Sequence, residues 1–256
     1  MNYEKKIERK FLNRSSLKKV LKFHYSTSYL DLDSEINANI SWINEKLTEK
    51  DIVNIQENAK EIIYFTKNKE KNLKFTEENN INFRKATPLN FNKKKIKINI
   101  LSKILQRSFN FKPNKTRTYP SAGGLYPIEL FLGIDKSNFQ DNIKTGLYHY
   151  NMKEKELCFI NSHNIYKENL LKQQVPSFIL LYFINIERAI VKYDNRGYRH
   201  ALIETGIMSN LIDNNSNILG LSTKCWSSFD DRRLCKIFDF NSNLMLPVMI
   251  QMIGNI

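Results

Sequence analysis

The sequence has few cysteines, few glycines and no long apolar run, and each shortage excludes a class of protein. Three cysteines occur in 256 residues, none with C-x-x-C spacing, so neither a disulfide framework nor a cysteine metal site is predicted. None of the eight glycines forms the G-x-G-x-x-G pattern of a nicotinamide-binding loop. The longest apolar run, Phe178 to Ile184, is too short to cross a membrane, so no membrane partner is expected.

Targeting and metal-binding signals are also missing. The first 22 residues are basic but contain no apolar core, which argues against a signal peptide, and scattered cysteines suit a reducing compartment. We therefore expect a cytoplasmic protein. The four histidines show no ligand spacing, so no metal site is predicted, and Cys225 is interpreted as a packing residue.

The positive charge is large and unevenly distributed. The chain carries 40 Lys and Arg against 26 Asp and Glu, a formal net charge of +14, which is compatible with nucleic-acid binding. No zinc finger, helix-turn-helix or aromatic platform accompanies this charge, so no nucleic-acid partner is predicted. Residues 81–128 contain eleven cations and no acid, whereas residues 1–80 contain 15 cations and 13 acids. The basic stretch suits an anionic cofactor or an acidic partner, although compositional drift towards lysine would also produce it.

The hydrophobic pattern changes near residue 80. Residues 1–80 predict a mainly helical extension, with helix starts at Ser15 or Ser16, Ser34 and Thr48, and a polar linker from residue 67. Residues 81–256 form a second predicted domain, in which runs of strand length alternate with helical periodicity. The predicted strands are 128–134, 146–150, 157–160, 178–186 and 244–253, and the predicted helices are 98–109 and 196–214. This order indicates a core of mixed helices and strands.

A turn-rich segment carries the strongest local signal. Residues 117–127 read Arg-Thr-Tyr-Pro-Ser-Ala-Gly-Gly-Leu-Tyr-Pro, and the last eight contain two prolines, two glycines and a serine. Glycines let backbone N–H groups approach a flat or anionic ligand, and the Ser121 hydroxyl adds a polar group. Taken by itself, such a segment is a structural turn more often than a ligand-binding loop.

Residues 120–127 and the segment Lys192-Tyr-Asp-Asn-Arg-Gly-Tyr-Arg199 are specific in combination. They resemble the flavin-contacting loop and the catalytic segment of the SagB-type (McbC-like) dehydrogenases, the azoline-oxidising branch of the nitroreductase superfamily. Weaker matches follow the same order along the chain, at residues 23–28, 146–150, 201–206 and 229–231. The resemblance covers most of the chain and is weak before residue 81.

This resemblance implies an α+β fold of the nitroreductase type. Its mixed sheet of four to five strands would be wrapped by helices and preceded by the helical extension, so that residues 81–256 form the FMN-binding domain. The family is usually a homodimer with FMN at the subunit interface. On the family pattern, the residues that contact the cofactor are Pro120, Ser121, Ala122, Gly123, Gly124, Leu125 and Gly220.

The FMN phosphate is expected to lie against the start of the basic stretch. Nitroreductases hold it with an Arg-x-Ser-x-Arg/Lys-x-Phe segment, and Lys85 and Thr87 fill the first two positions of that pattern here. The third position is Leu89, which removes one expected cation. Because a phosphomonoester needs about two positive partners, Arg84 or Arg117 would replace the missing one.

Lys192 and Tyr193 are the predicted catalytic residues. Oxidation of an azoline removes a proton from the former peptide Cα and a hydride from the adjacent ring CH₂, and it leaves an aromatic ring. The hydride would go to flavin N5 and the proton to a general base. The family assigns this chemistry to the adjacent Lys-Tyr pair. Either group acts as a base only if its pKa of about 10 is lowered, by burial against the flavin and by Arg196 or Arg199.

The resemblance implies an FMN-dependent dehydrogenase that converts thiazolines or oxazolines to thiazoles or oxazoles in a ribosomally made peptide of bacteriocin, thiopeptide or cytolysin type. Its partners would be an azoline-containing precursor peptide and the subunits of a cyclodehydratase complex, with dioxygen reoxidising the flavin. Two alternatives stay open: a small-molecule NAD(P)H nitroreductase or quinone reductase, and a scaffold subunit without flavin. Departures from the family pattern at Leu89, Ile207 and Ser222 favour the scaffold, whereas the intact Lys-Tyr pair disfavours the nitroreductase.

Overall fold

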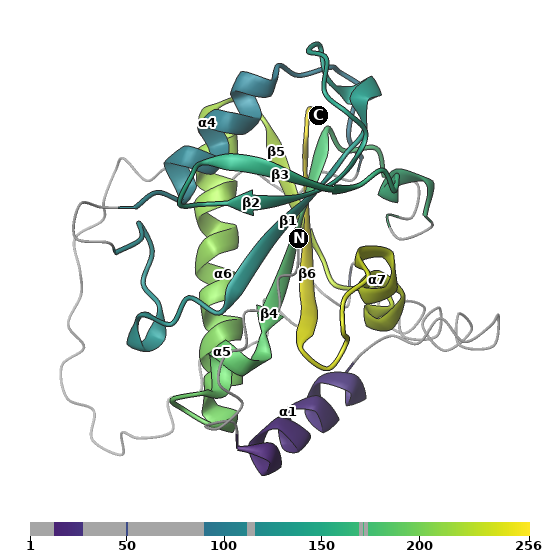
Figure 1. Cartoon of the computed structure of the whole chain (residues 1–256). Coiled ribbons are helices and arrows are strands. Elements are labelled where there is room, and N and C mark those ends of the chain that lie inside the picture. Colours follow the sequence, from purple (N-terminus) through teal and green to yellow (C-terminus); the bar gives the residue numbers. More distant parts are fainter. Residues whose placement is uncertain (1–12, 28–49, 51–89, 112–115, 169–170, 172–173) are drawn as a thin grey trace. The chain divides into compact units, whose positions relative to one another are not determined.

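The computed structural model describes residues 13–27, 50, 90–111, 116–168, 171 and 174–256 (Figure 1). The helices predicted from Ser34 and Thr48 and the linker from residue 67 lie outside these residues. So do three of the predicted phosphate-binding residues, Arg84, Lys85 and Thr87. The domain boundary expected at residue 80 therefore stays a prediction.

The described part of the chain is built around a six-stranded antiparallel sheet, in the order β3-β2-β1-β4-β6-β5. The strands are β1 (Ile128–Ile134), β2 (Gly146–Asn151), β3 (Glu156–Asn161), β4 (Phe178–Asn185), β5 (Ser222–Trp226) and β6 (Met245–Gly254). The α+β class is confirmed, with six strands where four to five were expected.

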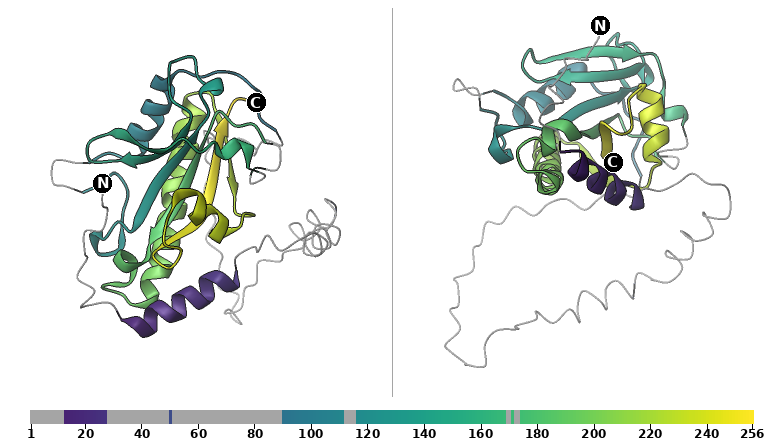
Figure 2. Two further views of the ribbon diagram at one scale, coloured as in Figure 1. Left: turned by 45° about the vertical axis from the view of Figure 1, so that its right-hand side comes forward. Right: turned by 60° about the horizontal axis from the view of Figure 1, so that its bottom comes forward.

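Helices cover both faces of this sheet (Figures 1 and 2). They are α1 (Arg14–Ser26), α4 (Ile98–Ser108), α5 (Ile186–Ile190), α6 (Asn195–Ile218) and α7 (Asp231–Phe238), with short 3-10 turns η2 (Ala122–Gly124), η3 (Lys136–Asn138) and η4 (Ile165–Lys167). The long helix α6 and α4 pack on one face, and α7 packs on the other.

The central strand β4 explains why the sequence forms two layers. Seven of its eight residues are buried, because successive side chains of the strand point to opposite faces of the sheet and helices cover each face. Leu180 and Tyr182 belong to the core shared with α4 and α6, whereas Leu181 and Phe183 belong to the core shared with α7. The continuous apolar run that was too short for a membrane is thus a doubly covered strand.

Most predicted elements are confirmed to within a few residues, and three short ones were missed. The strand predicted to end at residue 186 ends at Asn185, whose side chain accepts the Arg188 N–H and so starts α5. Strand β5 has only five residues, Ser-Thr-Lys-Cys-Trp, and no clear alternation. Helix α7 has eight residues and begins at the Asp230 cap, too short for its periodicity to stand out.

Helix α1 carries part of the predicted N-terminal extension. Its cap is Asn13, whose side-chain oxygen accepts the N–H groups of Ser15 at 3.0 Å and Ser16 at 3.2 Å, so the helix begins slightly earlier than predicted. It packs against α5 and α6 and belongs to one compact unit with residues 85–256. This helix is therefore part of the same body as the sheet.

Candidate active site

The loop at residues 120–127 and the Lys192-Tyr193 pair are far apart in the sequence, and the fold brings them into contact. The point of contact is Gly123 in η2. A Cβ atom added to Gly123 would lie 2.8 Å from the Tyr193 hydroxyl oxygen and 3.2 Å from both Cδ and Nζ of Lys192. Gly123 has a φ of +62°, in the left-handed region that glycine adopts without strain. Both segments predicted to share one site therefore lie together.

The pair lies in a tight turn between α5 and α6. Gly197 makes this turn possible, because a Cβ atom there would lie 1.9 Å from the Ala189 carbonyl oxygen. The first turn of α6 thus packs directly on the backbone of α5. Asp194, which follows the pair, has φ 49° and ψ −142°, a strained backbone conformation for a residue with a side chain. Strain of this kind is typical of functional sites.

The two side chains of the pair point outward from this turn. Lys192 is exposed and Tyr193 is half-buried. The Tyr193 ring packs edge-on against the His200 ring, with 5.2 Å between centroids, and Lys192 Nζ lies 5.3 Å from the centre of the Tyr193 ring. An ammonium group and a phenol are thus available at the surface beside η2.

A buried carboxyl group of α6 holds the loop from below. Ser121 Oγ donates a hydrogen bond to Glu204 Oε2 at 2.5 Å and accepts the Tyr126 N–H at 2.8 Å. Glu204 is 3% exposed, and its Oε1 has no hydrogen-bond partner among the described residues. Burial raises the pKa of Glu204 to about 7, against the opposing effects of the Ser121 hydrogen bond and of Arg117 and Arg188. Glu204 lies in the weaker family match at residues 201–206, but no role for it was predicted from the sequence.

Replacement of Glu204 by Gln should change how stability depends on pH. The pKa of about 7 lies above the ordinary value of 4.5, so the folded chain holds this proton more tightly than the unfolded chain. Its contribution to stability is therefore present at acid pH and lost as the pH rises through 7. From pH 5 to pH 8, the free energy of unfolding of E204Q should rise by about 2 kcal/mol relative to that of the wild type.

Urea denaturation at several pH values measures this difference. The control is Glu154→Gln, which removes a carboxylate whose side chain is 55% exposed in the β2–β3 turn, and its pH profile should follow the wild type. Parallel profiles for E204Q and wild type would show that Glu204 ionises normally.

Arg117, a predicted phosphate partner, is engaged in an aromatic cluster. Its guanidinium carbon lies 4.4 Å from the centre of the Tyr126 ring and 5.4 Å from that of Phe111. Its Nη1 donates a hydrogen bond to the Tyr119 hydroxyl at 2.7 Å. These contacts brace the loop between Tyr119 and Tyr126 and account for the residue structurally. The phosphate role of Arg117 stays a prediction without support from these contacts.

The other predicted cofactor residues of the loop lie around Gly123. Pro120 and Gly124 are exposed, and Ala122 and Leu125 are half-buried. Gly124 has a φ of +67°, and a Cβ atom added there would lie more than 4 Å from every described residue outside its own chain neighbours. The two adjacent glycines therefore present bare backbone at the surface next to the Lys-Tyr pair.

Gly220 lies far from the Lys-Tyr pair of the same chain. It lies just beyond the end of α6, whereas the pair precedes the start of that 24-residue helix, so the two are roughly 36 Å apart along the helix axis. The Gly220 N–H donates to Asn217 O at 3.1 Å, and the Leu221 N–H donates to Ser216 O at 2.9 Å, which is a Schellman motif. Helix termination explains this glycine, and its cofactor role stays a prediction.

A half-buried charge cluster of Glu129, His149 and Arg188 was not predicted from the sequence. Glu129 of β1 pairs with the Arg188 guanidinium of α5, and its Oε2 lies 2.9 Å from His149 Nε2. Burial acts to raise the pKa of Glu129, but the His149 hydrogen bond and the Arg188 charge outweigh it and lower the pKa to about 2. The cluster ties α5, just before Lys192, to the strand that follows the loop. The available signal was Glu129 itself, an acid within the apolar run of residues 128–134.

Three segments that match the family pattern, residues 23–28, 192–199 and 229–231, meet in a second, buried cluster. His24 Nδ1 lies 2.8 Å from the Tyr198 hydroxyl, and His24 Nε2 lies 3.3 Å from Asp231 Oδ2 at the start of α7. Burial lowers the pKa of His24 to about 4, so the ring is neutral at neutral pH. Nearby, Ser16 Oγ donates to Asp194 Oδ1 at 3.1 Å. Helices α1 and α7 thereby fix the first turns of α6 and the turn that carries the pair.

Neither a metal centre nor a membrane span is found in the described part of the chain. No three His, Cys, Asp or Glu side chains gather there in a way that could hold a metal ion. No helix among those described has the length and hydropathy to cross a membrane. Cys225 is exposed on β5, so its interpretation as a packing residue is wrong.

Comparisons with known proteins place these features in context. No family model matches the chain. The chain is 31% identical over 182 residues to the microcin B17-processing protein McbC of Escherichia coli, which covers 66% of each protein. It is 27% identical over 142 residues to a proposed nitroreductase of Methanocaldococcus jannaschii, covering 52% of this chain and 69% of that one. The chain thus spans about two thirds of the length of these relatives.

Solved structures share the fold. A chain of the E. coli microcin synthetase McbBCD complex, determined with truncated pro-MccB17 bound, matches with a TM-score of 0.78 and 23% identity, over 96% of this chain and 95% of that one. A proposed nitroreductase of Ralstonia eutropha matches with a TM-score of 0.58 and 18% identity, over 67% of this chain and 79% of that one.

Proposed function

Because this chain belongs to the SagB-type (McbC-like) dehydrogenases of the nitroreductase superfamily, it is an oxidoreductase, and we propose that it oxidises azolines in a ribosomally made peptide. Thiazolines or oxazolines would become thiazoles or oxazoles, with FMN as the cofactor. The solved complex that contains the matching fold includes McbB, McbD and a truncated pro-peptide. That assembly supports an azoline-containing precursor peptide as substrate and cyclodehydratase subunits as partners for this chain.

One observation carries the proposal: the contact of Gly123 with Lys192 and Tyr193. The residues on each side of that contact come from the two specific segments of the sequence, which are about 70 residues apart by the numbering. A loop that served only to reverse the direction of the chain would not need to lie against an adjacent Lys and Tyr. The geometry therefore supports a site in which the loop presents a ligand to the pair.

The residues present suit a flat cofactor such as FMN. The exposed backbone of Gly123 and Gly124 offers a surface without side chains, which a planar ring could approach closely. Ser121 is hydrogen-bonded to Glu204, and Tyr126 packs against Arg117, so contacts within the chain support the loop without a ligand. Bound FMN would supply the two-electron acceptor that the oxidation needs.

The chain itself would handle the proton. Conversion of an azoline to an azole removes two hydrogens, one as the hydride that the cofactor accepts and one as a proton from the former Cα. Lys192 Nζ or the Tyr193 hydroxyl would take that proton, since both lie beside the loop. Closure of a peptide over these exposed groups would exclude water from the reacting carbon.

A homodimer is part of the same proposal. Helix α6 exposes two large apolar side chains, Leu202 at 39% and Ile203 at 55%. Adjacent exposed apolar residues on a long helix are typical of an interaction surface. Pairing of two chains through this face would place a second subunit beside Arg199 and His200, close to the pair.

The proposed function is tested with purified protein and a synthetic azoline peptide. The protein should show the visible absorbance of bound flavin, and mass spectrometry should show loss of two hydrogen atoms per ring oxidised. Rapid NAD(P)H oxidation without azole formation would instead identify a small-molecule reductase. Colourless protein that takes up no added FMN would identify a scaffold subunit, the alternative that Leu89, Ile207 and Ser222 favour.

A further inference from the structure

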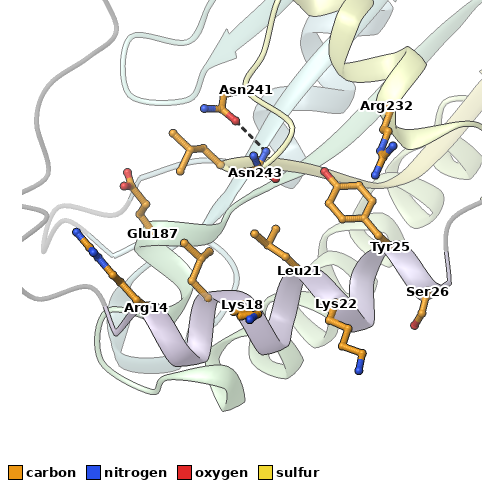
Figure 3. Close-up of a pocket in the computed structure, with 12 residues that line it drawn as sticks. Arg14, Lys18, Leu21, Lys22, Tyr25, Ser26, Glu187, Arg232, Asn241 and Asn243 are labelled. Carbon is orange, nitrogen blue, oxygen red and sulfur yellow. Dashed lines mark hydrogen bonds between the residues drawn. The ribbon is translucent and has the colours of Figure 1, made fainter.

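Helix α1 borders a groove that the proposed active site does not use. The groove has a volume of about 970 Å³, and its walls come from α1, the first turn of α5, and residues 232–244 (Figure 3). Glu187 lies on the α5 wall and Arg232 on the α7 wall. The loop at residues 120–127 contributes no residue to this lining.

The α1 wall consists of two parallel stripes. Leu17, Leu21 and Tyr25 recur every four residues and form an apolar stripe, and Arg14, Lys18 and Lys22 recur every four residues beside it. Figure 3 shows Arg14, Lys18 and Lys22 along the helix, with Leu21 and Tyr25 facing the opposite wall. Eight residues of helix rise about 12 Å, so each stripe extends over roughly two turns.

The groove is strongly basic. Four cations line it, at positions 14, 18, 22 and 232, against the single carboxylate of Glu187. Arg14, Lys18 and Lys22 are exposed and form no ion pair with any described residue. Arg232 lies over the Tyr25 ring, 5.1 Å from its centre, so its charge is held against the α1 wall of the groove. A row of cations that forms no ion pair among the described residues, next to an apolar stripe, favours an occupant with the opposite pattern.

We propose that this groove binds an acidic amphipathic helix of a separate partner protein. Carboxylates at positions i, i+4 and i+8 of that helix would meet the cationic stripe, and its neighbouring apolar residues would cover Leu17 and Leu21. A second copy of this chain is the competing occupant, and sedimentation of the wild type and of K18E/K22E distinguishes it from a separate partner. The proposal does not depend on the chemistry at Lys192.

The test uses a fluorescent peptide of about 15 residues, designed as an amphipathic helix with three Glu residues spaced four positions apart beside a leucine stripe. Fluorescence anisotropy should show saturable binding to the full chain that weakens as salt is added. The double substitution K18E/K22E should weaken binding at least tenfold. The matched control is Lys19→Glu, which changes an exposed lysine of α1 outside the groove and should leave binding unchanged.

A charge-reversed peptide distinguishes binding at a specific docking site from nonspecific binding. With Lys in place of Glu, it should bind K18E/K22E better than the wild type. Circular dichroism shows whether each variant keeps its fold, and azoline oxidation by K18E/K22E on a short peptide reports separately on the proposed function. Equal binding of the acidic peptide and a Gln version, or equal losses in K19E and K18E/K22E, would overturn the proposal. So would a wild-type dimer in sedimentation that K18E/K22E dissociates.

Discussion

Substitution of Lys192 by Ala should lower the rate of azoline oxidation by at least about 100-fold, the usual effect of losing a positioned general base. The side chain is exposed, so its removal should leave the fold intact. The loop keeps its support, because Ser121, Glu204 and Tyr126 hold one another independently of Lys192. Flavin content should therefore stay at the wild-type level while turnover falls.

The substrate can report directly on the proton that Lys192 is proposed to remove. An azoline peptide deuterated at the former Cα should show a primary isotope effect, larger in K192A than in the wild type because proton removal then limits the rate. Lys153→Ala is the matched control, since that side chain is 80% exposed in the β2–β3 turn, and it should retain full activity. Unchanged turnover in K192A would eliminate Lys192 as the base.

The Tyr193→Phe variant decides between the two candidate bases. Phenylalanine retains the ring that packs on His200 but lacks the hydroxyl group that lies beside Gly123. If Tyr193 holds the proton, Y193F should lose at least about 100-fold in turnover, the effect of a missing general base. If Lys192 holds it, Y193F should lose about tenfold or less, the effect of one missing hydrogen bond.

The core elements could be predicted because each has a strong local apolar pattern, a continuous run for strand β4 and helical periodicity for helix α6. The buried run at Phe178–Asn185 and the long helix Asn195–Ile218 are set by local sequence, and the structure confirms both. Helix α7 could not be predicted in the same way. Half of its eight residues are charged, and it is stabilised by Leu234 and Phe238 packing on the sheet, which only the tertiary fold provides.

The candidate site could likewise be predicted only in part from local sequence. The loop and the Lys-Tyr pair were found as motifs, but their contact through Gly123 depends on a turn that brings α6 onto α5. The role of Glu204 follows from its burial beneath Ser121, a long-range contact that no local pattern contains. Gly220 was carried over by position in a motif, and the length of α6 separates it from the pair in the same chain.

Gly123→Ala should reduce azoline oxidation by about 10- to 100-fold, far more than Gly124→Ala. Both glycines have left-handed backbones, with φ of +62° and +67°, so alanine strains the backbone by about 1 kcal/mol at either position. A methyl group at position 123 would lie 2.8 Å from Tyr193 Oη and 3.2 Å from Lys192 Nζ, whereas one at position 124 would contact none of the described residues. These atoms are the ends of flexible side chains, so the clash displaces the reactive groups rather than the fold. Misplacement of such groups by about 1 Å is enough for a 100-fold loss.

A double-mutant cycle isolates this contact. In a Y193F background the methyl group of Gly123→Ala no longer meets a hydroxyl, so its additional cost in turnover should shrink, whereas the cost of Gly124→Ala should not change. Thermal unfolding of G123A and G124A should agree within the error of measurement, because they share the same backbone strain. If G123A and G124A lose equal activity, the loop and the pair do not act as one site. A loss confined to G123A that Y193F relieves would tie the catalytic effect to the one contact in which the loop and the pair meet.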